Sequence, residues 1–242
     1  MAIDFQTSFA HDGLMQRRHV PLANLSPRAQ LSAGRMAHRV GQLLVGLVLY
    51  GVSMAMMVRA GLGLNPWDVF HAGLAGRVGW TFGQITIAVG ALVLLLWIPL
   101  RQWPGLGTVC NVFVIGLAVD ATLSMLSAPE GLAARVAMLV AGVVLNGLAG
   151  GLYIGSQLGP GPRDGLMTGL AARTGWSLRL VRTGIEVTVL VVGWLLGGTV
   201  GLGTVVYAVS IGPLVHLFLP LCTVRLDPAP ATAARVSSSD RV

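Results

Sequence analysis

Six long stretches with few charged residues set the limits on how this chain can fold. They cover residues 40–58, 82–100, 106–126, 133–155, 180–199 and 202–222. A helix of about 20 residues rises about 30 Å, which is the thickness of the hydrocarbon core of a bilayer. Backbone groups must be satisfied internally in lipid, and these stretches lack the in-and-out alternation of barrel strands. The sequence therefore predicts an all-α, polytopic transmembrane helix bundle with about six spans.

Composition and charge agree with a membrane protein. The 242 residues are 54% hydrophobic and 10% charged, and the mean hydropathy is +0.76. In a soluble domain, about a quarter of all residues are charged. The net charge of +7 would suggest nucleic acid for a soluble protein, but here the arginines flank the apolar stretches, where they orient helices. We therefore expect the lipid bilayer, and no nucleic acid, as a partner.

The two ends of the chain are polar. Residues 1–38 carry Arg17, Arg18, Arg28 and Arg35 and contain no apolar segment of a signal peptide, so they are expected to form a cytoplasmic tail. Residues 223–242 are rich in Ala, Pro and Ser and are expected to be a disordered cytoplasmic tail. Between them, residues 39–222 form a single membrane domain. Most arginines fall on the side of the N-terminus, which predicts that both ends are cytoplasmic in a bacterial inner membrane.

The membrane domain contains an internal repeat. When residue i is set against residue i+96, residues 46–119 align with 142–215 without a gap, and about a third of the pairs are identical. The identities include Pro, Asp, Arg and Trp as well as the sequence GLGTV at 105–109 and 201–205. The repeats span about 40–126 and 133–222, with three full spans each. An odd number of spans predicts that the repeats are inverted, a common plan of secondary transporters, although duplication could also have built only a stable bundle.

Each repeat holds one segment too short to cross the bilayer. Residues 66–78 would rise about 20 Å as a helix. Asn65, just before the segment, suits an N-cap, and Pro66 and Asp68 suit the first and third helical positions. The segment is therefore expected to be a half-helix that dips into the membrane or lies on its surface. Its copy begins with Gly161-Pro162-Arg163-Asp164, so Arg163 replaces Trp67 and Gly161 replaces the Asn cap.

The polar residues of these helix starts are candidates for binding a solute. Asp68 and Asp164 either cap their helices or belong to a central polar site. Arg163 beside a helix N-terminus suits a carboxylate or phosphate, or it is a cytoplasmic anchor. Asn111 can hydrogen-bond across helices, whereas the glycines of the GLGT sequences suit close packing equally well. The candidate substrate-binding residues are Asn65, Trp67, Asp68, Asn111, Arg163 and Asp164.

Three further ionisable residues lie within predicted spans. Asp120 aligns with His216 in the repeat, and ionisable groups at such depth are usually functional or paired, unless they reach the solvated interface. Glu186 follows Arg182 by one helical turn, so these two side chains can neutralise each other. Asp120, Glu186 and His216 are the candidates for coupling to an ion or proton.

Two sequence stretches resemble a known family. GLGLNPWDVFHAGLAGRVGWTFGQ and PGLGTVCNVFVIGLAVD are similar to the YczE/YitT-type bacterial integral membrane proteins, and closer to the YczE-like branch. The resemblance covers about residues 40–220 and implies a multispan helical fold in the plasma membrane. It implies no substrate. The Pro-Arg-Asp of the second repeat departs from the Pro-Trp-Asp of the first, which leaves open whether both halves bind.

The sequence contains no Walker loop, HExxH motif or nucleophile elbow. We expect no enzyme activity, no cofactor and no metal. The leading interpretation is a secondary transporter or permease of a small polar or charged solute that works by alternating access. The alternative is a membrane regulatory or scaffold protein without transport activity, and a lipid-handling role ranks third.

Overall fold

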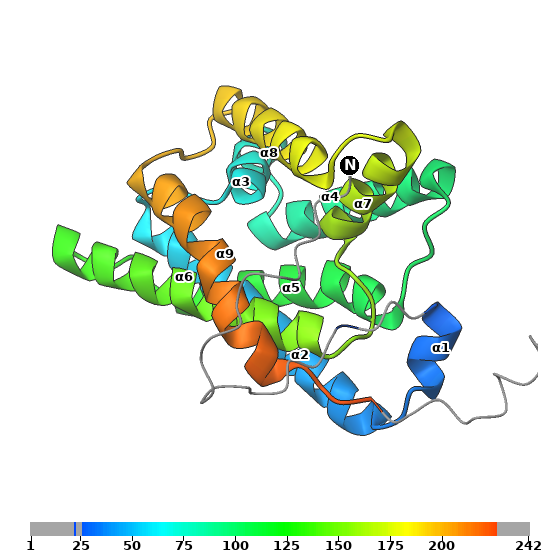
Figure 1. Ribbon diagram of the computed structural model, residues 1–242. Coiled ribbons are helices and arrows are strands. Elements are labelled where there is room, and N and C mark those ends of the chain that lie inside the picture. The colour runs from blue at the N-terminus through cyan, green and yellow to red at the C-terminus, as the bar shows by residue number, and fades with distance from the viewer. Residues whose placement is uncertain (1–21, 23–25, 227–242) are drawn as a thin grey trace, which may run out of the picture.

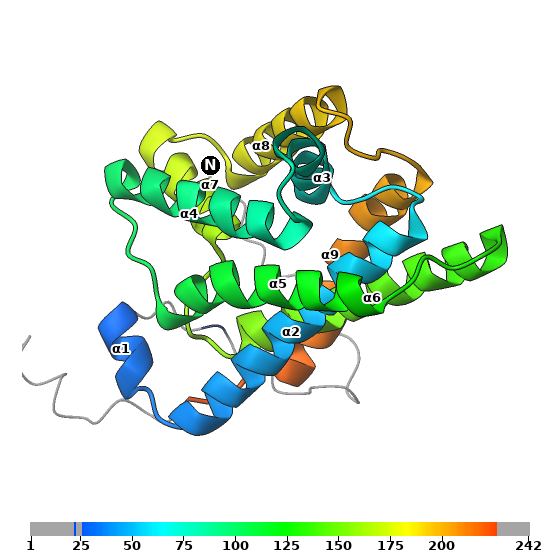
Figure 2. The same cartoon turned by 180° about the vertical axis from the view of Figure 1, so that it is seen from behind.

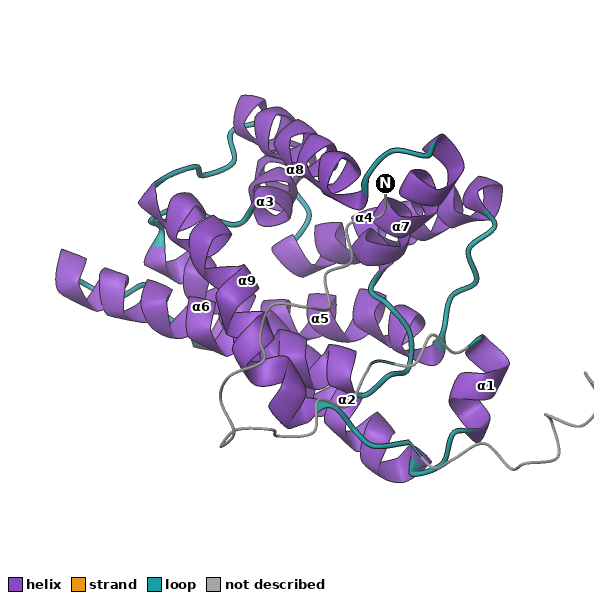
Figure 3. Ribbon diagram, viewed as in Figure 1, coloured by secondary structure: helices purple, strands orange, loops and turns teal. Residues whose placement is uncertain are grey.

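The fold is entirely helical in the part of the chain that the computed structural model describes, residue 22 and residues 26–226 (Figures 1 and 3). The expected tails therefore lie largely outside the described residues. The helices are α1 (Pro27–Ser32), α2 (Met36–Ala60), α3 (Pro66–Val78), α4 (Phe82–Leu100), α5 (Leu106–Met125), α6 (Leu132–Gly155), α7 (Pro162–Thr174), α8 (Leu178–Leu195) and α9 (Leu202–Cys222). The predicted helical membrane bundle is confirmed, and a short helix, α1, lies in the segment expected to be a tail.

Five of the described helices are long and apolar enough to cross a membrane: α2, α4, α5, α6 and α9. The sixth expected span, residues 180–199, differs. Helix α8 ends at Leu195 and carries Arg179, Arg182 and Glu186 within 18 residues, so it holds more charged residues than any of these five helices. The count of six full spans therefore becomes five, together with one charged helix of nearly the same length.

The two halves of the chain repeat helix by helix. Each helix from α6 to α9 begins 96 residues after its counterpart, with the pairs Met36 and Leu132, Pro66 and Pro162, Phe82 and Leu178, and Leu106 and Leu202. Local chemistry explains the shared starts. Proline occupies the first turn of α3 and α7, and Thr81 and Ser177 accept a backbone hydrogen bond as N-caps of α4 and α8.

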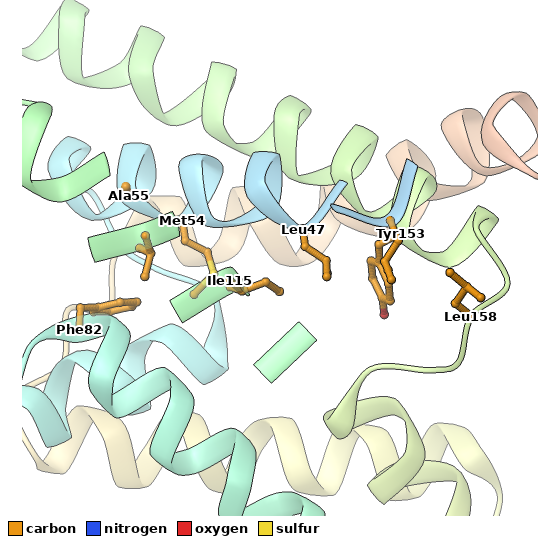
Figure 4. Packing of buried hydrophobic residues seen from close by; sticks show 9 residues of the cluster. Leu47, Met54, Ala55, Phe82, Ile115, Tyr153 and Leu158 are labelled. Carbon is orange, nitrogen blue, oxygen red and sulfur yellow. The ribbon is translucent and has the colours of Figure 1, made fainter. Parts of the chain in front are cut away.

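The helices form two layers (Figures 1 and 2). In the α2 layer, α2 packs against α5 and α6, and α6 packs against α9. In the α3 layer, α3 packs against α8 and α7 packs against α4, so each short helix rests on a helix of the other half. The hydrophobic core follows this plan: Leu47, Met54 and Ile115 lie in one cluster with Tyr153, whose ring extends from α6 toward the interior (Figure 4).

Helices α2 and α6 are antiparallel at the centre of the α2 layer. Arg39, near the start of α2, donates from Nε to the carbonyl of Ser156 at 2.9 Å and from Nη2 to that of Gln157 at 2.7 Å. Arg135, near the start of α6, donates from Nε to Ala60 at 2.7 Å and from Nη2 to Gly61 at 2.8 Å. The start of each helix therefore lies at the end of the other.

The GLGT sequences hold the loop of the opposite half. The amide of Gly107 donates to the carbonyl of Leu158, and that of Gly203 donates to Leu62, both at 2.7 Å. A Cβ atom on Gly105 would lie 2.6 Å from the Leu158 oxygen. These glycines therefore serve close packing of α5 and α9 against the loops that lead into α7 and α3.

The two halves differ where the layers meet. Helix α4 packs on α5, but α8 and α9 make no comparable contact. Gly83 and Gly116 let α4 approach α5, because a Cβ on Gly83 would lie 2.0 Å from the Gly116 oxygen. Their counterparts are Arg179 and Gly212, and a Cβ on Gly212 would meet nothing within 4 Å. The layers are thus joined on the α4–α5 side and separated on the α8–α9 side.

Candidate functional site

A cavity of about 530 Å³ lies between the two layers. The side chains around it come from every helix from α2 to α9. Its polar lining comprises Tyr50, Asn65, Trp67, His71, Thr86, Asn111, Asn146, Tyr153, Arg163, Asp164, Arg182, Glu186, Tyr207 and His216. A volume of this size accommodates a small solute.

The start of α3 forms one wall and is built as the sequence predicts. The Oδ1 atom of Asn65 accepts the amide of Asp68 at 3.0 Å as an N-cap, and its Nδ2 donates to Oδ2 of Asp68 at 2.6 Å. Asp68 is completely buried. A buried carboxylate is costly without charged or hydrogen-bonded partners, so the cap accounts for only one of its two oxygens.

The other oxygen of Asp68 faces two basic side chains. Its Oδ1 lies 3.4 Å from Nδ1 of His71 and 3.9 Å from Nη2 of Arg163 on α7. This oxygen accepts no hydrogen bond from any described residue. The buried Nε2 of His71 and the buried Nε1–H donor of Trp67 likewise have no hydrogen-bond partner in the described part of the chain. The starts of the two short helices thus meet through one ion pair, with polar atoms still available beside it.

The start of α7 lies against the first half of the chain. The guanidinium carbon of Arg163 lies 4.9 Å from the ring centre of Trp67, its counterpart in the repeat, which gives a cation–π contact. Asp164 is exposed, and its Oδ2 accepts the hydroxyl of Tyr153 at 2.8 Å. The two aspartates therefore differ: Asp68 is buried with an ion-pair partner, and Asp164 is open to the cavity.

Residues that correspond in the repeat recur around the cavity. Tyr50 aligns with Asn146, and Asn111 aligns with Tyr207. Tyr207 donates its hydroxyl to Oδ1 of Asn146 at 3.0 Å, and Asn146 donates from Nδ2 to Ser53 at 2.7 Å. The cavity therefore lies where the two halves face each other.

The candidate residues reach this site to different degrees. Asn65, Trp67, Asn111, Arg163 and Asp164 line the cavity, and Asp68 lies directly behind it. Among the coupling candidates, His216 and Glu186 line the cavity, and Glu186 accepts a hydrogen bond from Nε of Arg182 at 3.0 Å. The expected Arg182–Glu186 pair is therefore present.

Asp120 does not line the cavity. Its Oδ1 accepts the amide of Gly83 at 2.7 Å, and its Oδ2 accepts a short hydrogen bond from the Thr81 hydroxyl. A carboxylate at a helix start is stabilised by the free amides and the helix dipole. Asp120 thus joins α5 to the start of α4, a role that its counterpart His216 does not share.

Several cavity residues were missing from the candidates drawn from sequence. His71, Tyr50, Asn146, Tyr153 and Tyr207 are the principal ones. The repeat offered a signal, because Asn111 was a candidate and its aligned partner is Tyr207. His71 follows Asp68 by one helical turn, a spacing that places both side chains on one face of α3. Among the described residues, no three His, Cys, Asp or Glu side chains gather closely enough to hold a metal ion.

The fold and the cavity define a class: a polytopic helical membrane protein with a polar site between two layers of helices. Residues 37–220 match the model of a family of unknown function, DUF6198, and the chain belongs to this family. It is 40% identical over 177 residues to an uncharacterized protein of Haemophilus influenzae, which covers 73% of this chain and 81% of that one.

Two Bacillus subtilis proteins are also similar. The uncharacterized membrane protein YczE is 37% identical over 178 residues, which cover 72% of this chain and 82% of YczE. The uncharacterized protein YyaS is 24% identical over 181 residues, which cover 73% of this chain and 90% of YyaS. The resemblance to YczE is therefore confirmed. No solved structure matches the chain.

Proposed function

We propose that this protein is a secondary transporter that moves a small polar or charged solute through the cavity between its two layers. The observation that carries the proposal is the contact of Asp68 with Arg163, because it joins the two short helices at the cavity. An ionisable pair is expensive inside a membrane protein and is usually kept for function. A solute that pairs with these groups would also use the unpartnered polar atoms of Trp67, Asp68 and His71.

The arrangement of the two halves supports alternating access. The antiparallel packing of α2 and α6 and the exchange of the short helices between halves fit inverted repeats around a shared site. The layers are joined at α4–α5 and separated at α8–α9. Movement of one layer against the other would close one side and open the other, which is the change that alternating access requires.

The proposal also states the membrane in which the protein lies and its orientation there. We place it in a bacterial plasma membrane with both ends cytoplasmic, since most arginines flank that side. It needs no enzyme activity, cofactor or nucleic acid. Its partners are the lipid bilayer and a small-molecule solute, and its oligomeric state is left open.

A ligand screen by thermal unfolding tests the proposal. The purified protein is heated with members of a panel of charged and polar metabolites. A ligand that binds the folded state raises the unfolding temperature. We expect at least one compound to stabilise the wild type and Arg179→Gln, whose arginine is exposed on α8, but not Arg163→Ala. Equal stabilisation of Arg163→Ala by every active compound would contradict the proposed site.

A tail deletion separates a transporter from a scaffold. Helix α1 should be retained, because Arg39 donates from Nη1 to the carbonyl of Gln30 at 2.6 Å. Removal of residues 1–21 leaves this contact in place. A transporter without these residues should still bind its ligand and move it, whereas an adaptor that works through the tail should lose its cellular phenotype.

A further inference from the structure

One carboxylate oxygen has two competing partners in this site. Oδ2 of Asp68 is engaged by Asn65, but Oδ1 lies near both Nδ1 of His71, at 3.4 Å, and Nη2 of Arg163, at 3.9 Å. His71 belongs to the same helix as Asp68, and Arg163 belongs to the other half of the chain. Whichever side chain holds Oδ1 decides whether the other is free to bind something else.

Hydrogen bonds assign the proton of neutral His71. The Thr86 hydroxyl donates to the carbonyl of Phe82 at 2.9 Å, so it offers only lone pairs to Nδ1 of His71, 3.4 Å away. Asp68 is also an acceptor, and Nδ1 therefore carries the hydrogen in the neutral ring. The remaining nitrogen, Nε2, is buried and has no hydrogen-bond partner among the described residues. A proton taken up by His71 adds at Nε2.

The helices packed around His71 bring several other charged and titratable groups to the cavity. Helix α4 contributes no charged side chain, and Asp120 of α5 is held at the start of α4. Besides Asp68 and Arg163, those that line the cavity with His71 are Tyr50 of α2, Tyr153 of α6, Asp164 of α7, Arg182 and Glu186 of α8, and Tyr207 and His216 of α9. Arg182 is paired with Glu186, and Asp164 with Tyr153.

We propose, resting on the transporter function above, that the cavity takes up one proton at His71 together with one organic carboxylate at Arg163. When Nε2 of His71 binds a proton, its Nδ1–H becomes a charged donor and holds Oδ1 of Asp68. Arg163 is then released from Asp68 and turns its guanidinium to the solute. The positive charge gained at His71 balances the negative charge of the carboxylate, so the loaded site keeps the net charge of the empty one.

The chemistry of the site favours a carboxylate. A guanidinium offers two parallel N–H groups that match the two oxygens of a carboxylate. The residue that aligns with Arg163 in the first half of the chain is Trp67, which carries no charge. The two helix starts together therefore supply one guanidinium, which suits one anionic group. The Nε1 atom of Trp67 is a buried donor beside it with no hydrogen-bond partner in the described residues. The site therefore suits a solute with a single carboxylate.

Quenching of Trp67 fluorescence by iodide tests the inference without any transport. Iodide is an anion that quenches an indole on contact, and Arg163 lies over Trp67, so iodide bound at Arg163 is expected to lie beside that ring. The Trp67 signal is the difference between wild type and Trp67→Phe in the full chain. Acrylamide, a neutral quencher, measures access to the ring without charge. Trp80→Phe, a change at an exposed tryptophan, is the matched control.

We expect iodide quenching of the Trp67 signal to rise as the pH falls below neutrality, because burial lowers the pKa of His71 from its usual value, while acrylamide quenching stays constant. His71→Gln should abolish the pH dependence, and Arg163→Gln should abolish the excess of iodide over acrylamide quenching. His38→Gln, at an exposed histidine of α2, and Trp80→Phe should preserve both effects.

Two patterns of quenching would overturn the inference, and so would the absence of any quenching effect. One is a pH dependence that persists in His71→Gln or disappears in His216→Gln, because another group would then bind the proton. The other is a parallel rise of acrylamide quenching, which would show opening of the cavity instead of anion binding. If quenching behaves as expected but the protein transports nothing, the proton–carboxylate site stands and the transporter function fails. If the protein transports a solute but shows no quenching effect, the transporter function stands and the proton–carboxylate site fails.

Discussion

Arg39 and Arg135 occupy corresponding positions in the two halves, and each caps the first helix of the other half. Arg39 binds the carbonyls of Ser156 and Gln157 at the end of α6, and Arg135 binds those of Ala60 and Gly61 at the end of α2. A cation at a helix C-terminus satisfies carbonyls that have no partner within the helix and interacts favourably with the helix dipole. The same contact, made twice, fixes the antiparallel pair at the centre of the protein.

Replacement of these arginines should lower stability unequally. Arg39 is fully buried, and Arg39→Gln would leave several carbonyls without a charged donor, so we expect a loss of about 3 kcal/mol. Arg135 is half-buried, and Arg135→Gln should cost about 1 kcal/mol. Thermal unfolding of the purified variants measures the difference, with Arg179→Gln as the control. Equal stability of Arg39→Gln and Arg179→Gln would show that the caps do not hold the halves together.

Gly116 of α5 and Gly212 of α9 occupy corresponding positions and give a matched pair of variants. A Cβ on Gly116 would lie 2.5 Å from Cγ1 of Ile87 and 2.7 Å from the Gly83 oxygen, so Gly116→Ala should cost about 1–3 kcal/mol by overpacking. Gly212→Ala, the corresponding change in α9, meets open space and should leave the unfolding temperature unchanged or raise it slightly. If both variants unfold alike, α9 packs against α8 as α5 packs against α4.

Asp120 should behave as a cap instead of a proton carrier. Asp120→Ala removes the acceptor for Thr81 and Gly83 and should cost about 1–2 kcal/mol, while Asp120→Asn keeps an acceptor and should cost less. Neither change should alter the pH dependence of iodide quenching at Trp67. A normal unfolding temperature combined with a lost pH dependence would instead assign proton binding to Asp120.

The two aspartates of the short helices should differ in their effect on binding. Asp68 is buried between His71 and Arg163, so Asp68→Asn removes the charge for which both basic groups compete. Asp164 is exposed and accepts one hydrogen bond from Tyr153. We expect Asp68→Asn to free Arg163 at every pH, so that ligand stabilisation in the thermal screen persists but no longer depends on pH, and Asp164→Asn to reduce the stabilisation and keep its pH dependence. A pH dependence that is lost in Asp164→Asn but kept in Asp68→Asn would place the binding site at the second short helix alone.

Sequence patterns predict much of this fold, for physical reasons that the structure makes visible. The short helix at Pro66–Val78 has the predicted bounds, because Asn65 and Pro66 specify its start and Gly79 adopts the left-handed conformation that ends it. The 96-residue offset holds for every helix of the membrane domain, and several starts share their chemistry: a proline begins α3 and α7, a hydroxyl caps α4 and α8, and a glycine precedes α5 and α9. The predicted span at 180–199 was less accurate, because its apolar content outweighed its two charges and Arg179 lay just outside it.

The site was only partly predictable. Asn65, Asp68 and Arg163 stood out because they are polar residues in an apolar sequence. His71 and Tyr153 were missed, since a histidine inside a helix and a tyrosine near a helix end have ordinary structural roles. Contacts between residues far apart in the chain, such as His71 and Arg163 around one oxygen of Asp68, depend on the exchange of short helices between the halves. No local pattern specifies that exchange.

Uptake into proteoliposomes tests the central claim most directly. The pure protein is reconstituted, and entry of radiolabelled metabolites, organic carboxylates among them, is followed with an inward proton gradient. The account predicts that at least one carboxylate accumulates in vesicles with wild type or Arg179→Gln, that Arg163→Gln abolishes the accumulation, and that removal of the gradient does the same. No uptake of any compound by folded wild-type protein, or equal uptake by Arg163→Gln, would contradict it.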